Sequence, residues 1–561
     1  MADSEAITTM TDSLRIAVAQ VNPTVGDVDG NAALILKLWR QAAALDADLV
    51  VFPELCLSGY PPEDLVQKPL FLAAVHAEID RLSAESKTIK TGLLLGSPWR
   101  DEDKVYNAAV LMDHGSVHAR KKYDLPNYDV FDEKRVFEAG ALPGPIDFRG
   151  IRIGVPVCED VWTPDVLECL EETGAELIIS LNGSPYEQGR YDTRIQIVLN
   201  RIRESGLPIL YVNQVGGQDE LVFDGASFVI NADYSMPIQL PGFAEALTLT
   251  EWSRCDDGWV CAEGARDVPP DSLESMYQAM TLGLRDYVRK NGFPGVILGM
   301  SGGVDSALSA AVAVDALGPE KVWMVMMPSR YTSAESLEDA AEMAELLDTR
   351  LDSINIGPAM NAFDAMLAPL FDGRAADTTE ENIQARSRGL VLMAISNKFG
   401  HVLLSTGNKS EMSVGYATLY GDMCGGYSVL KDVYKTDVFR LCRWRNQHHP
   451  LRALGPSGQV VPERVIAKPP SAELRPDQKD LDSLPPYDEL DKILHCLIEQ
   501  DLGIAEIEAR GHDVETVRQV WKMLDLSEYK RRQTPPGVKI GSRSFGKERR
   551  YPITNGFRGQ I

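Results

Sequence analysis

Three segments in the first half of the chain each place one reactive side chain at the end of an apolar run. They are FPELCLSGY (52–60), KKYDLPNY (121–128) and GVPVCEDVW (154–162), which supply Glu54, a lysine and Cys158. A carboxylate, an ammonium and a thiol together suit amide hydrolysis. The thiolate attacks the carbonyl carbon, the carboxylate moves protons and the lysine stabilises the tetrahedral intermediate. A nearby cation is also expected to lower the pKa of the thiol. Taken singly, the cysteine would be core packing and the charged residues solvated surface.

The segment LGMSGGVDSAL (298–308) in the second half suits the binding of a phosphate. Its small residues lie between a predicted strand and a predicted helix, where backbone N–H groups and the helix dipole attract an anion. Gly302 and Gly303 allow the chain to approach that anion closely. The GK[ST] ending of a Walker A loop is missing, which argues against an enzyme that transfers a γ-phosphate. A plain strand–helix turn is the structural alternative.

Alternating strands and helices must position these segments. In the first half we expect strands at 14–19, 48–52, 91–96, 108–112, 151–157, 177–181, 209–213 and 227–230, with helices at 32–44, 163–173 and 191–205. In the second half we expect helices at 272–290, 305–317 and 379–399 and strands at 295–300, 322–327 and 401–406. Thr378 and Glu381 have the spacing of a capping box at the start of the long helix. This alternation predicts α/β layers in both halves.

Two polar stretches interrupt the pattern. The Pro-rich residues 231–270 indicate a domain boundary near their end, and residues 445–490, rich in Pro and Asp, indicate a loop or mobile lid. A length of 561 residues predicts two to four domains.

The composition excludes several classes of protein. The chain has 56 Lys and Arg against 82 Asp and Glu, and a net charge of −26 repels nucleic acid and anionic membranes. No apolar run approaches the roughly 18 residues of a membrane span, and no export signal is visible at the N-terminus. Eight cysteines without CxxC pairs fit reduced thiols, so we expect a cytoplasmic protein. The eight histidines have no HExxH-like spacing, so we expect no zinc.

The Ser-Gly-Gly-x-Asp-Ser segment resembles the PP-loop of ATP pyrophosphatases, which adenylate a substrate and release pyrophosphate. The resemblance implies that Ser301, Gly302, Gly303 and Ser306 hold the pyrophosphate part of ATP. It also implies that Asp305 is a ligand of Mg²⁺, which prefers oxygen donors. The flanking residues Gly299, Met300 and Val304 belong to the same ATP-binding segment.

Three later segments are similar to NAD⁺ synthetases: TEENIQARSRG (379–389), STGNKSEMSVGYATLYGDMCGGYSVLKDVYKT (405–436) and EYKRRQTPPGVKI (528–540). The resemblance implies that Thr406 contacts ATP and that Asn382, Glu411 and Lys530 contact deamido-NAD⁺. Glu411 is a second ligand of Mg²⁺ in this interpretation. The stretch 530–558 has nine Lys or Arg against one acid, which is the basic patch that a dinucleotide and ATP require in so acidic a chain, or else a solvated tail.

The first-half segments resemble the nitrilase superfamily, whose Glu, Lys and Cys occur in this order. The residues alone leave Lys121 and Lys122 open, and the family's lysine lies three positions before a leucine, which selects Lys122 before Leu125. The resemblance implies a supporting role for Glu133. It implies that glutamine is bound by Tyr60, Tyr128, Glu159, Ser184 and Arg190. Asp124 departs from the family pattern, where a histidine is common.

Together the halves resemble the family of glutamine-dependent NAD⁺ synthetases over residues 14–552. The resemblance implies a nitrilase-like αββα sandwich at 14–265 and a doubly wound α/β PP-loop domain at 270–561, after a flexible N-terminus at 1–13. Glutamine, deamido-NAD⁺ and ATP with Mg²⁺ would be the substrates and cofactor, with no zinc or flavin, no nucleic acid and no membrane. Ammonia from a Cys158 thioester reaction would amidate an acyl-adenylate, releasing AMP and pyrophosphate. The fused activities suggest a tunnel for ammonia, and the family suggests a homo-oligomer such as an octamer.

Two alternatives stay open. An amidase fused to a PP-loop ligase could amidate another acid, as GMP or asparagine synthesis requires, although the NIQAR and GDMCGGYS segments argue against it. A non-catalytic assembly protein that retains only the folds is the second. It would have no need to keep Glu54, Lys122, Cys158, Asp305 and Glu411 together.

Overall fold

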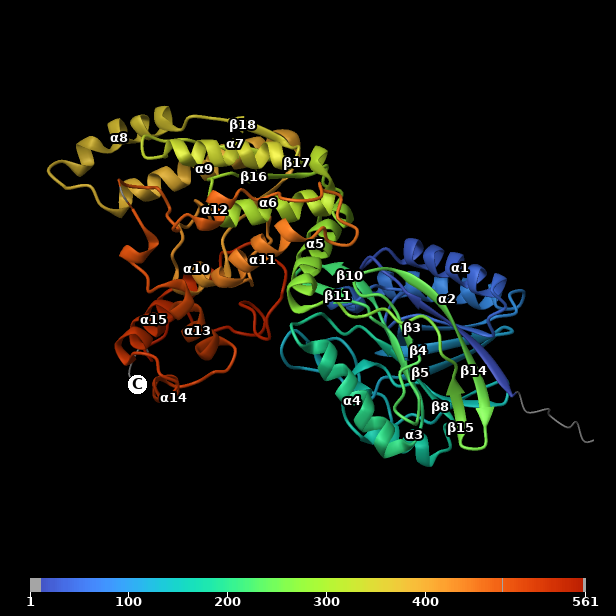
Figure 1. Ribbon diagram of the computed structural model, residues 1–561. Coiled ribbons are helices and arrows are strands. Elements are labelled where there is room, and N and C mark those ends of the chain that lie inside the picture. The colour runs from blue at the N-terminus through green and yellow to red at the C-terminus, as the bar shows by residue number, and fades with distance from the viewer. Residues whose placement is uncertain (1–11, 477, 558–561) are drawn as a thin grey trace, which may run out of the picture. The chain divides into compact units, whose positions relative to one another are not determined.

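The computed structural model describes residues 12–476 and 478–557, which form two compact units (Figure 1). The first unit extends to Gln218 and continues from Val222 to Pro270, and the second contains Asp219–Leu221 and the chain from Asp271 onward. Most of the flexible terminus expected at 1–13 lies outside the described residues, and the first strand begins at Ser13. In the described part of the chain, no helix is long and apolar enough to cross a membrane.

Two large sheets make up the first unit over the described residues. The larger has the order β15-β14-β1-β2-β3-β4-β5, with strands Gly258–Cys261, Ala246–Cys255, Ser13–Gln20, Leu49–Val51, Gly92–Asp101, Lys104–Asp113 and Ser116–Lys121. The second has the order β13-β12-β9-β8-β7-β6, with strands Ile238–Gln239, Phe228–Ile230, Ile209–Asn213, Leu177–Asn182, Ile151–Gly154 and Ile146–Phe148. A separate hairpin pairs β10 (Val215–Gln218) with β11 (Leu221–Asp224).

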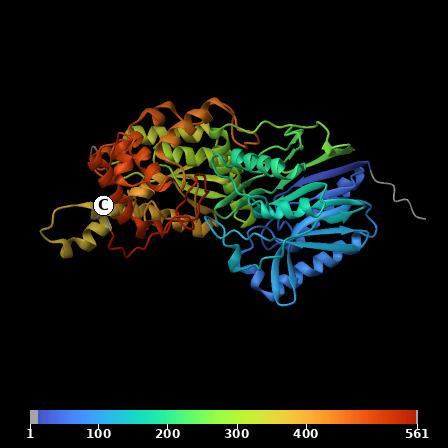
Figure 2. The same cartoon turned by 90° about the horizontal axis from the view of Figure 1, so that it is seen from below.

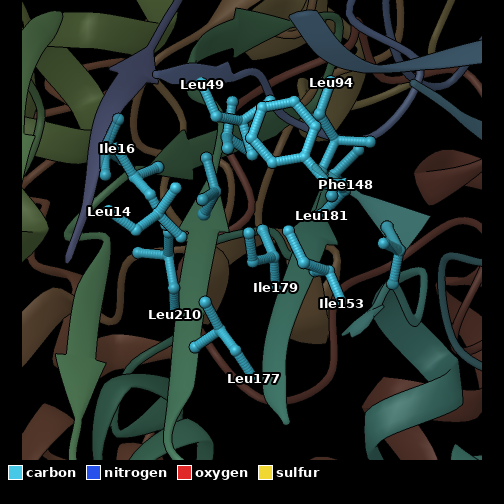
Figure 3. Close-up of a cluster of buried hydrophobic side chains, with 14 of the residues drawn as sticks. Leu14, Ile16, Leu49, Leu94, Phe148, Ile153, Leu177, Ile179, Leu181 and Leu210 are labelled. Carbon is cyan, nitrogen blue, oxygen red and sulfur yellow. The ribbon is translucent and has the colours of Figure 1, made fainter. Parts of the chain in front are cut away.

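Alternating side chains divide each sheet between two cores, as the period of two along a strand requires. On β1, Leu14 and Ile16 belong to the core between the sheets (Figure 3), as does Val18, whereas Ala17 and Ala19 pack beneath helices on the other face. The helices on that face are α1 (Val28–Ala44) and α2 (Pro69–Glu85).

The second sheet is covered on its outer face by α3 (Asp165–Glu172) and α4 (Arg190–Ser205), the teal helices of Figure 2. Ile178 of β8 packs in the apolar cluster beneath them. The resulting helix–sheet–sheet–helix order confirms the predicted αββα sandwich. The strands expected in this half are all present, and the elements that the sequence analysis missed before residue 231 include α2, β5, β6, β10 and β11.

The stretch 231–270, at whose end we expect a domain boundary, belongs to the first unit, which ends at Pro270. It contains β13, β14 and β15, and β14 pairs antiparallel with β1 from Ser13 opposite Ser253 to Gln20 opposite Ala246. Much of β14 is only partly buried, which is why its alternation is weak in the sequence.

The second unit contains a parallel sheet of order β18-β17-β16-β19-β20. Its strands are Arg350–Ser353, Val322–Met326, Val296–Gly299, Val402–Ser405 and Tyr427–Ser428. Its longer helices are α5 (Ser272–Lys290), α6 (Val304–Leu317), α7 (Ala334–Leu346), α8 (Gly357–Phe371), α9 (Thr378–Phe399), α11 (Lys435–Gln447), α13 (Tyr487–Ile498) and α15 (Val514–Leu526). The shorter ones are α10 (Lys409–Val414), α12 (Glu463–Ala467), α14 (Ile504–Ala509) and α16 (Glu528–Arg531).

The strand order of this sheet reverses at β16. The chain runs from β16 outward through β17 and β18, and then returns to place β19 on the other side of β16. A crevice outside the carboxyl ends of the strands at such a reversal is the usual ligand site of a doubly wound sheet. The PP-loop segment follows β16 and Thr406 follows β19, so both lie at this reversal.

Two local predictions need correction. Asp377 is the N-cap of α9 and forms the capping box with Glu380, one residue earlier than the expected pair of Thr378 and Glu381. The segment 445–490 is not only loop, because it contains α12, a 3₁₀ turn at Asp480–Asp482 and the start of α13. Helix α13, which begins at Tyr487 after the N-cap Pro486, buries Leu490 and Leu494 in an apolar cluster that the Pro-rich composition conceals.

Candidate functional sites

The first candidate site lies where both sheets of the first unit end. Glu54 follows β2, Lys122 follows β5 and Cys158 follows β7 at the start of a 3₁₀ turn, Cys158–Val161. All three side chains are buried, Lys122 contacts both Glu54 and Glu133, and the thiol of Cys158 lies close enough to feel their charges.

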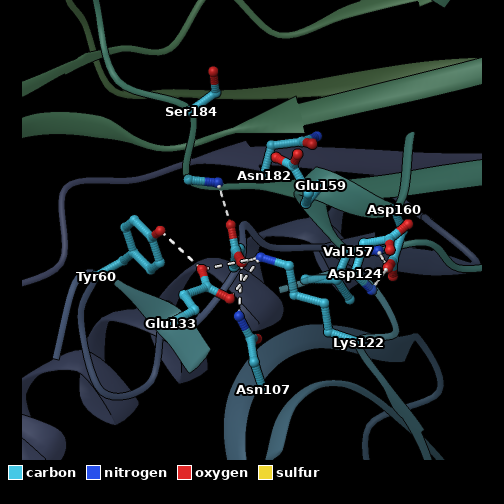
Figure 4. A network of polar contacts seen from close by, with 12 residues as sticks. Tyr60, Asn107, Lys122, Asp124, Glu133, Val157, Glu159, Asp160, Asn182 and Ser184 are labelled. Carbon is cyan, nitrogen blue, oxygen red and sulfur yellow. Dashed lines mark hydrogen bonds and ion pairs between the residues drawn. The ribbon is translucent and has the colours of Figure 1, made fainter. Parts of the chain in front are cut away.

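Lys122 is the centre of the polar network. Its ammonium, fully buried, donates to Glu54 Oε1 at 2.8 Å and to Glu133 Oε1 and Oε2 at 3.0 and 2.9 Å (Figure 4). Burial lowers the pKa of Lys122, but the carboxylates of Glu133 and Glu54 outweigh it and hold the pKa well above its usual value. The lysine therefore stays an ammonium. Lys121, the alternative, lies on the surface and pairs with Asp101.

Glu54 is fixed by two groups that the sequence analysis missed. Asn107 Nδ2 donates to Oε1 at 2.7 Å, and the Gly183 N–H donates to Oε2 at 2.8 Å. With Lys122 these bonds use three of the roughly four lone pairs of the carboxylate, which leaves one on Oε2. Asn107 and Gly183 lie 53 and 129 residues from Glu54 in sequence, so no local pattern could reveal them.

The pKa of the Cys158 thiol is raised, whereas the sequence analysis predicts a lowered value. Burial, followed by the negative charge of Glu54, raises the pKa of the thiol well above its usual value and outweighs the lowering by Lys122. The resting group is therefore a neutral thiol rather than the thiolate that a neighbouring cation alone would favour. Its backbone has φ +48°, in the left-handed region that costs a non-glycine residue about 1–2 kcal/mol.

The residues implied to bind glutamine surround this network. The Tyr60 hydroxyl donates to Glu133 Oε1 at 2.9 Å, and the Tyr128 hydroxyl donates to both carboxylate oxygens of Glu159 at 2.9 and 3.0 Å. Burial raises the pKa of Glu159. These pairs place two tyrosines and a second carboxylate beside the triad.

Ser184 and Arg190 complete the set. Ser184 is held by Asn213, whose Oδ1 accepts from its N–H at 2.9 Å, and by Arg194, whose Nε donates to its hydroxyl at 3.0 Å. Arg190 begins α4 and stacks over Trp162, with its guanidinium carbon 5.2 Å from the ring centroid. Its Nη2 pairs with Glu187 at 3.4 Å, whereas its buried Nε donates to no protein partner among the described residues and is left for an anionic group. Arg194 was not predicted, although a buried arginine next to the NGSPYEQGR segment is central to its shape.

Asp124, which departs from the family pattern, has a defined environment. Its carboxylate accepts from the Thr163 hydroxyl, and its N–H donates to Asp160 Oδ1 at 2.8 Å. The aspartate therefore binds the neighbouring turn instead of the lysine.

The second candidate site is a cavity of about 550 Å³ in the second unit. It is lined by every residue of the PP-loop from Gly299 to Ser306, and by Thr406, Asn382, Glu411 and Lys530. Gly302 has φ +77°, and a Cβ there would lie 2.6 Å from the Ser336 carbonyl oxygen, so only glycine fits. The structure thus gathers all the residues implied to bind ATP and deamido-NAD⁺ around one cavity.

Asp305 and Glu411, the implied ligands of Mg²⁺, share one lysine. Lys435 forms ion pairs with both carboxylates, at 3.1 Å for Glu411, and Asn408 Nδ2 donates to Asp305 Oδ1 at 2.8 Å. Burial raises the pKa of Glu411 to about 8, opposed by Lys435. Over the residues described, no three His, Cys, Asp or Glu side chains gather as a metal site. Two carboxylates that already face one cation do fit Mg²⁺, which takes one or two carboxylates and completes its shell with phosphate and water.

Several cations of the basic stretch 530–558 form ion pairs within the fold and do not line the cavity. Of its cations, Lys530 lines the cavity and donates to the Gly415 and Ala417 carbonyls, both at 2.7 Å. Arg531 pairs with Glu528, and Lys539 pairs with Glu548. The cationic side chains that line the cavity are Arg388, Lys435, Lys468 and Lys530, so the predicted patch at 530–558 is wrong in its extent. Arg558 lies outside the described residues.

One part of the segment 445–490 forms a wall of the cavity. Glu473 accepts from the hydroxyls of Ser333 and Ser336 at 2.9 and 2.8 Å, at the start of α7, and pairs with Lys468 at 3.2 Å. The Leu474 carbonyl accepts from Gln384 on α9 at 3.2 Å. This wall therefore bridges the start of α7 and helix α9.

Family models match both units. The model described as carbon-nitrogen hydrolase matches residues 15–254, and the model described as NAD synthase matches residues 276–534.

Full-length relatives share nearly half of the sequence. The glutamine-dependent NAD(+) synthetase of Rhodobacter capsulatus is 49% identical over 98% of this chain and 100% of its own length, and that of Acinetobacter baylyi is 45% identical over 97% and 99%. Among solved structures, a glutamine-dependent NAD+ synthetase from Acinetobacter baumannii in complex with ADP is 44% identical, with a TM-score of 0.77 over 98% of this chain and 100% of that chain. A synthetase from Cytophaga hutchinsonii, at 21% identity and a TM-score of 0.80, shares the fold.

Proposed function

The chain belongs to the family of glutamine-dependent NAD⁺ synthetases, and from that premise we propose which of its residues perform the two half-reactions. The first unit releases ammonia from glutamine at Cys158. The second unit uses ATP to activate the carboxylate of deamido-NAD⁺, which ammonia then converts into the amide of NAD⁺. The observation that carries the first assignment is the Lys122 ammonium, buried between Glu54 and Glu133 beside a thiol.

Glu54 acts first, as general base. Because the thiol of Cys158 is neutral at rest, a base must take its proton as sulfur attacks the side-chain carbonyl carbon of glutamine. Oε2 of Glu54 has the free lone pair for this proton. Lys122 donates to the carbonyl oxygen as it becomes an oxyanion, and Glu133 keeps the lysine charged.

The same proton then leaves with the product. The tetrahedral intermediate collapses, the C–N bond breaks, and Glu54 returns the proton to the departing nitrogen as ammonia forms. Water, deprotonated by Glu54, attacks the thioester carbon, and glutamate leaves as the proton returns to sulfur. Glutamine itself is held by Tyr60, Tyr128, Glu159, Ser184 and Arg190. Glu159 is placed to meet an ammonium, and the partner-free Nε of Arg190 a carboxylate.

In the second unit, ATP occupies the cavity at the PP-loop. The carboxylate oxygen of deamido-NAD⁺ attacks the α-phosphorus and pyrophosphate departs, held by Ser301, Gly302, Gly303 and Ser306 at the start of α6. Ammonia attacks the acyl carbon of the adenylate, and the C–O bond to AMP breaks. AMP leaves, and the nitrogen loses one proton as the amide forms. Asp305 and Glu411 would hold Mg²⁺, which when bound neutralises charge on the phosphates. Thr406, Asn382 and Lys530 contact the two nucleotides, and Gly299, Met300 and Val304 shape the loop.

Amidation of a different acid receives no support from the relatives. The NAD synthase model covers the whole cavity-lining region, and the relatives compared share that name over their full length. A non-catalytic role is opposed by the buried charges of both sites, since burying a charge is costly unless it is paired or used.

The decisive experiment measures NAD⁺ formation from deamido-NAD⁺ and ATP–Mg²⁺ by wild type, Cys158→Ala and Cys169→Ala. Cys169 lies on α3, only partly buried, and serves as the matched control. We expect Cys158→Ala to lose glutamine-dependent synthesis and to keep ammonium-dependent synthesis, with Cys169→Ala unchanged. Glutamine use by Cys158→Ala would refute the nucleophile. Failure of all three proteins with either donor would refute the acid substrate.

A further inference from the structure

One buried carboxylate beside the first site has no part in the proton transfers. The side chain of Asp160 is only 1% exposed and forms no salt bridge within the described residues. Its oxygens accept backbone N–H groups instead. Oδ2 accepts from Val157 at 2.9 Å, and Oδ1 accepts from Tyr123 and Asp124 at 3.0 and 2.8 Å (Figure 4).

These three N–H groups flank the two groups that must meet the substrate carbonyl. Val157 directly precedes Cys158, and Tyr123 and Asp124 directly follow Lys122. Cys158 belongs to the turn after β7 in one sheet, whereas Lys122 follows β5 in the other sheet. A single carboxylate thus connects the end of one sheet to the end of the other, on either side of the reacting groups.

The backbone at Cys158 gives this connection a purpose. A non-glycine residue at φ +48° persists only where its surroundings over-determine the conformation. The bond from Val157 to Asp160 spans that residue and closes the turn, as a capping interaction does. Without it the turn could relax toward an ordinary conformation, and the thiol would move with it.

Only a carboxylate satisfies all three donors. Two oxygens with about four lone pairs accept three N–H groups, whereas an asparagine offers one oxygen and turns two N–H donors toward the remaining backbone donor. Burial raises the pKa of Asp160 to about 7, and its backbone hydrogen bonds oppose that rise.

We propose that Asp160 is a positioning residue for glutamine hydrolysis, tying the turn that carries Cys158 to the strand end that carries Lys122. The inference rests on the proposed function of this site. A displacement of about 1 Å between reacting groups costs on the order of 100-fold in rate, so loss of this tie acts on kcat. Of the residues proposed to hold glutamine, only Glu159 lies on this turn, and Tyr60, Tyr128, Ser184 and Arg190 lie outside it, so the loss acts on kcat more than on KM.

The test compares Asp160→Asn, Asp160→Glu, Cys158→Ala and the matched control Asp165→Asn in the full-length protein. Asp165 is exposed in the first turn of α3 and undergoes the same change of charge. Each variant is assayed for kcat and KM with glutamine and for NAD⁺ formation with ammonium. We expect Asp160→Asn to lose about 100-fold in kcat with KM for glutamine within threefold and ammonium-dependent synthesis within twofold. Asp160→Glu, which keeps both oxygens, should be at least about fivefold faster than Asp160→Asn.

Each outcome decides one of the two ideas. A kcat for Asp160→Asn within threefold of wild type overturns the inference, as does a rise in KM that matches the fall in kcat. If Asp160→Asn does not fold, Asp160→Ser, which keeps one acceptor oxygen, takes its place, and a kcat within threefold of wild type overturns the inference. Glutamine use by Cys158→Ala refutes the proposed function instead, whatever Asp160→Asn does.

Discussion

Replacing Lys121 and Lys122 in turn by methionine separates two lysines that the sequence alone cannot rank. Both are adjacent and chemically identical, and Lys121→Met is therefore a matched control for Lys122→Met. The structure gives them opposite environments. Lys122 is fully buried against two carboxylates, whereas Lys121 and its partner Asp101 have side chains 29% and 54% exposed.

The expected magnitudes follow from those environments. Removing one partner of a buried ion pair costs about 3–5 kcal/mol, and Lys122→Met leaves both Glu54 and Glu133 without their cation. For a domain of this size that corresponds to a fall in melting temperature of roughly 6–20 °C. Loss of the oxyanion donor costs a further factor of about 10²–10³ in kcat. An exposed pair such as Lys121–Asp101 contributes about 0–1 kcal/mol and nothing to catalysis.

The assay is glutamine hydrolysis, followed as glutamate release, with ammonium-dependent NAD⁺ formation and thermal unfolding measured on the same preparations. We expect Lys122→Met to lose glutamine hydrolysis by at least about 100-fold and Lys121→Met to match wild type. Ammonium-dependent synthesis should persist in both. The reasoning fails if Lys122→Met hydrolyses glutamine within tenfold of wild type, or if Lys121→Met is impaired as severely.

Three further outcomes are expected. Gly302→Ala should raise the KM for ATP at least about tenfold, because φ +77° and a Cβ 2.6 Å from the Ser336 carbonyl oxygen together cost more than about 1.4 kcal/mol. The assay is pyrophosphate release, and an unchanged KM would count against the loop geometry. Glu473→Gln should weaken the wall that bridges α7 and α9 and raise the KM for ATP several-fold with ammonium as donor, while glutamine hydrolysis stays at the wild-type rate; equal effects on both would contradict this. Alkylation of Cys158 by iodoacetamide, corrected with Cys158→Ala, should still increase with pH through 9, because burial and Glu54 raise the pKa of the thiol; a plateau below pH 7.5 would indicate a resting thiolate.

The sequence predicted correctly those elements whose signals lie entirely within one contiguous segment. The helix at 272–290 and the strand, turn and helix around the PP-loop lie where expected, because their apolar pattern and glycine turn are contiguous in sequence. The cap of α9 is displaced by one residue because Asp377 and Thr378 are both good capping residues, and the sequence alone does not choose between them.

Features that depend on distant parts of the chain could not be predicted in this way. The first site depends on hydrogen bonds from Asn107 and Gly183 to Glu54 and from Arg194 to Ser184. No local sequence pattern links the two residues of any of these pairs. The charge of residues 530–558 predicted a ligand patch, yet Glu528 pairs with Arg531 and Arg532, and Glu548 with Lys539, within the fold. The lowered thiol pKa was also wrong, since burial depends on the surrounding sheets and not on the neighbouring cation alone.

The pairing of β1 with β14 means that β1 is synthesised long before the strand it pairs with. Ser13 leaves the ribosome 240 residues before its partner Ser253, a delay of about 12–48 s at ordinary rates of bacterial or eukaryotic translation. Throughout that interval one edge of β1 has no strand beside it, so this apolar edge can pair with other chains and aggregate. Glu54 and Cys158 are synthesised within the same interval, so the sheet that carries Glu54 is completed only after both residues have emerged. A chaperone that shields nascent strands should therefore matter most while residues 20–246 are being made.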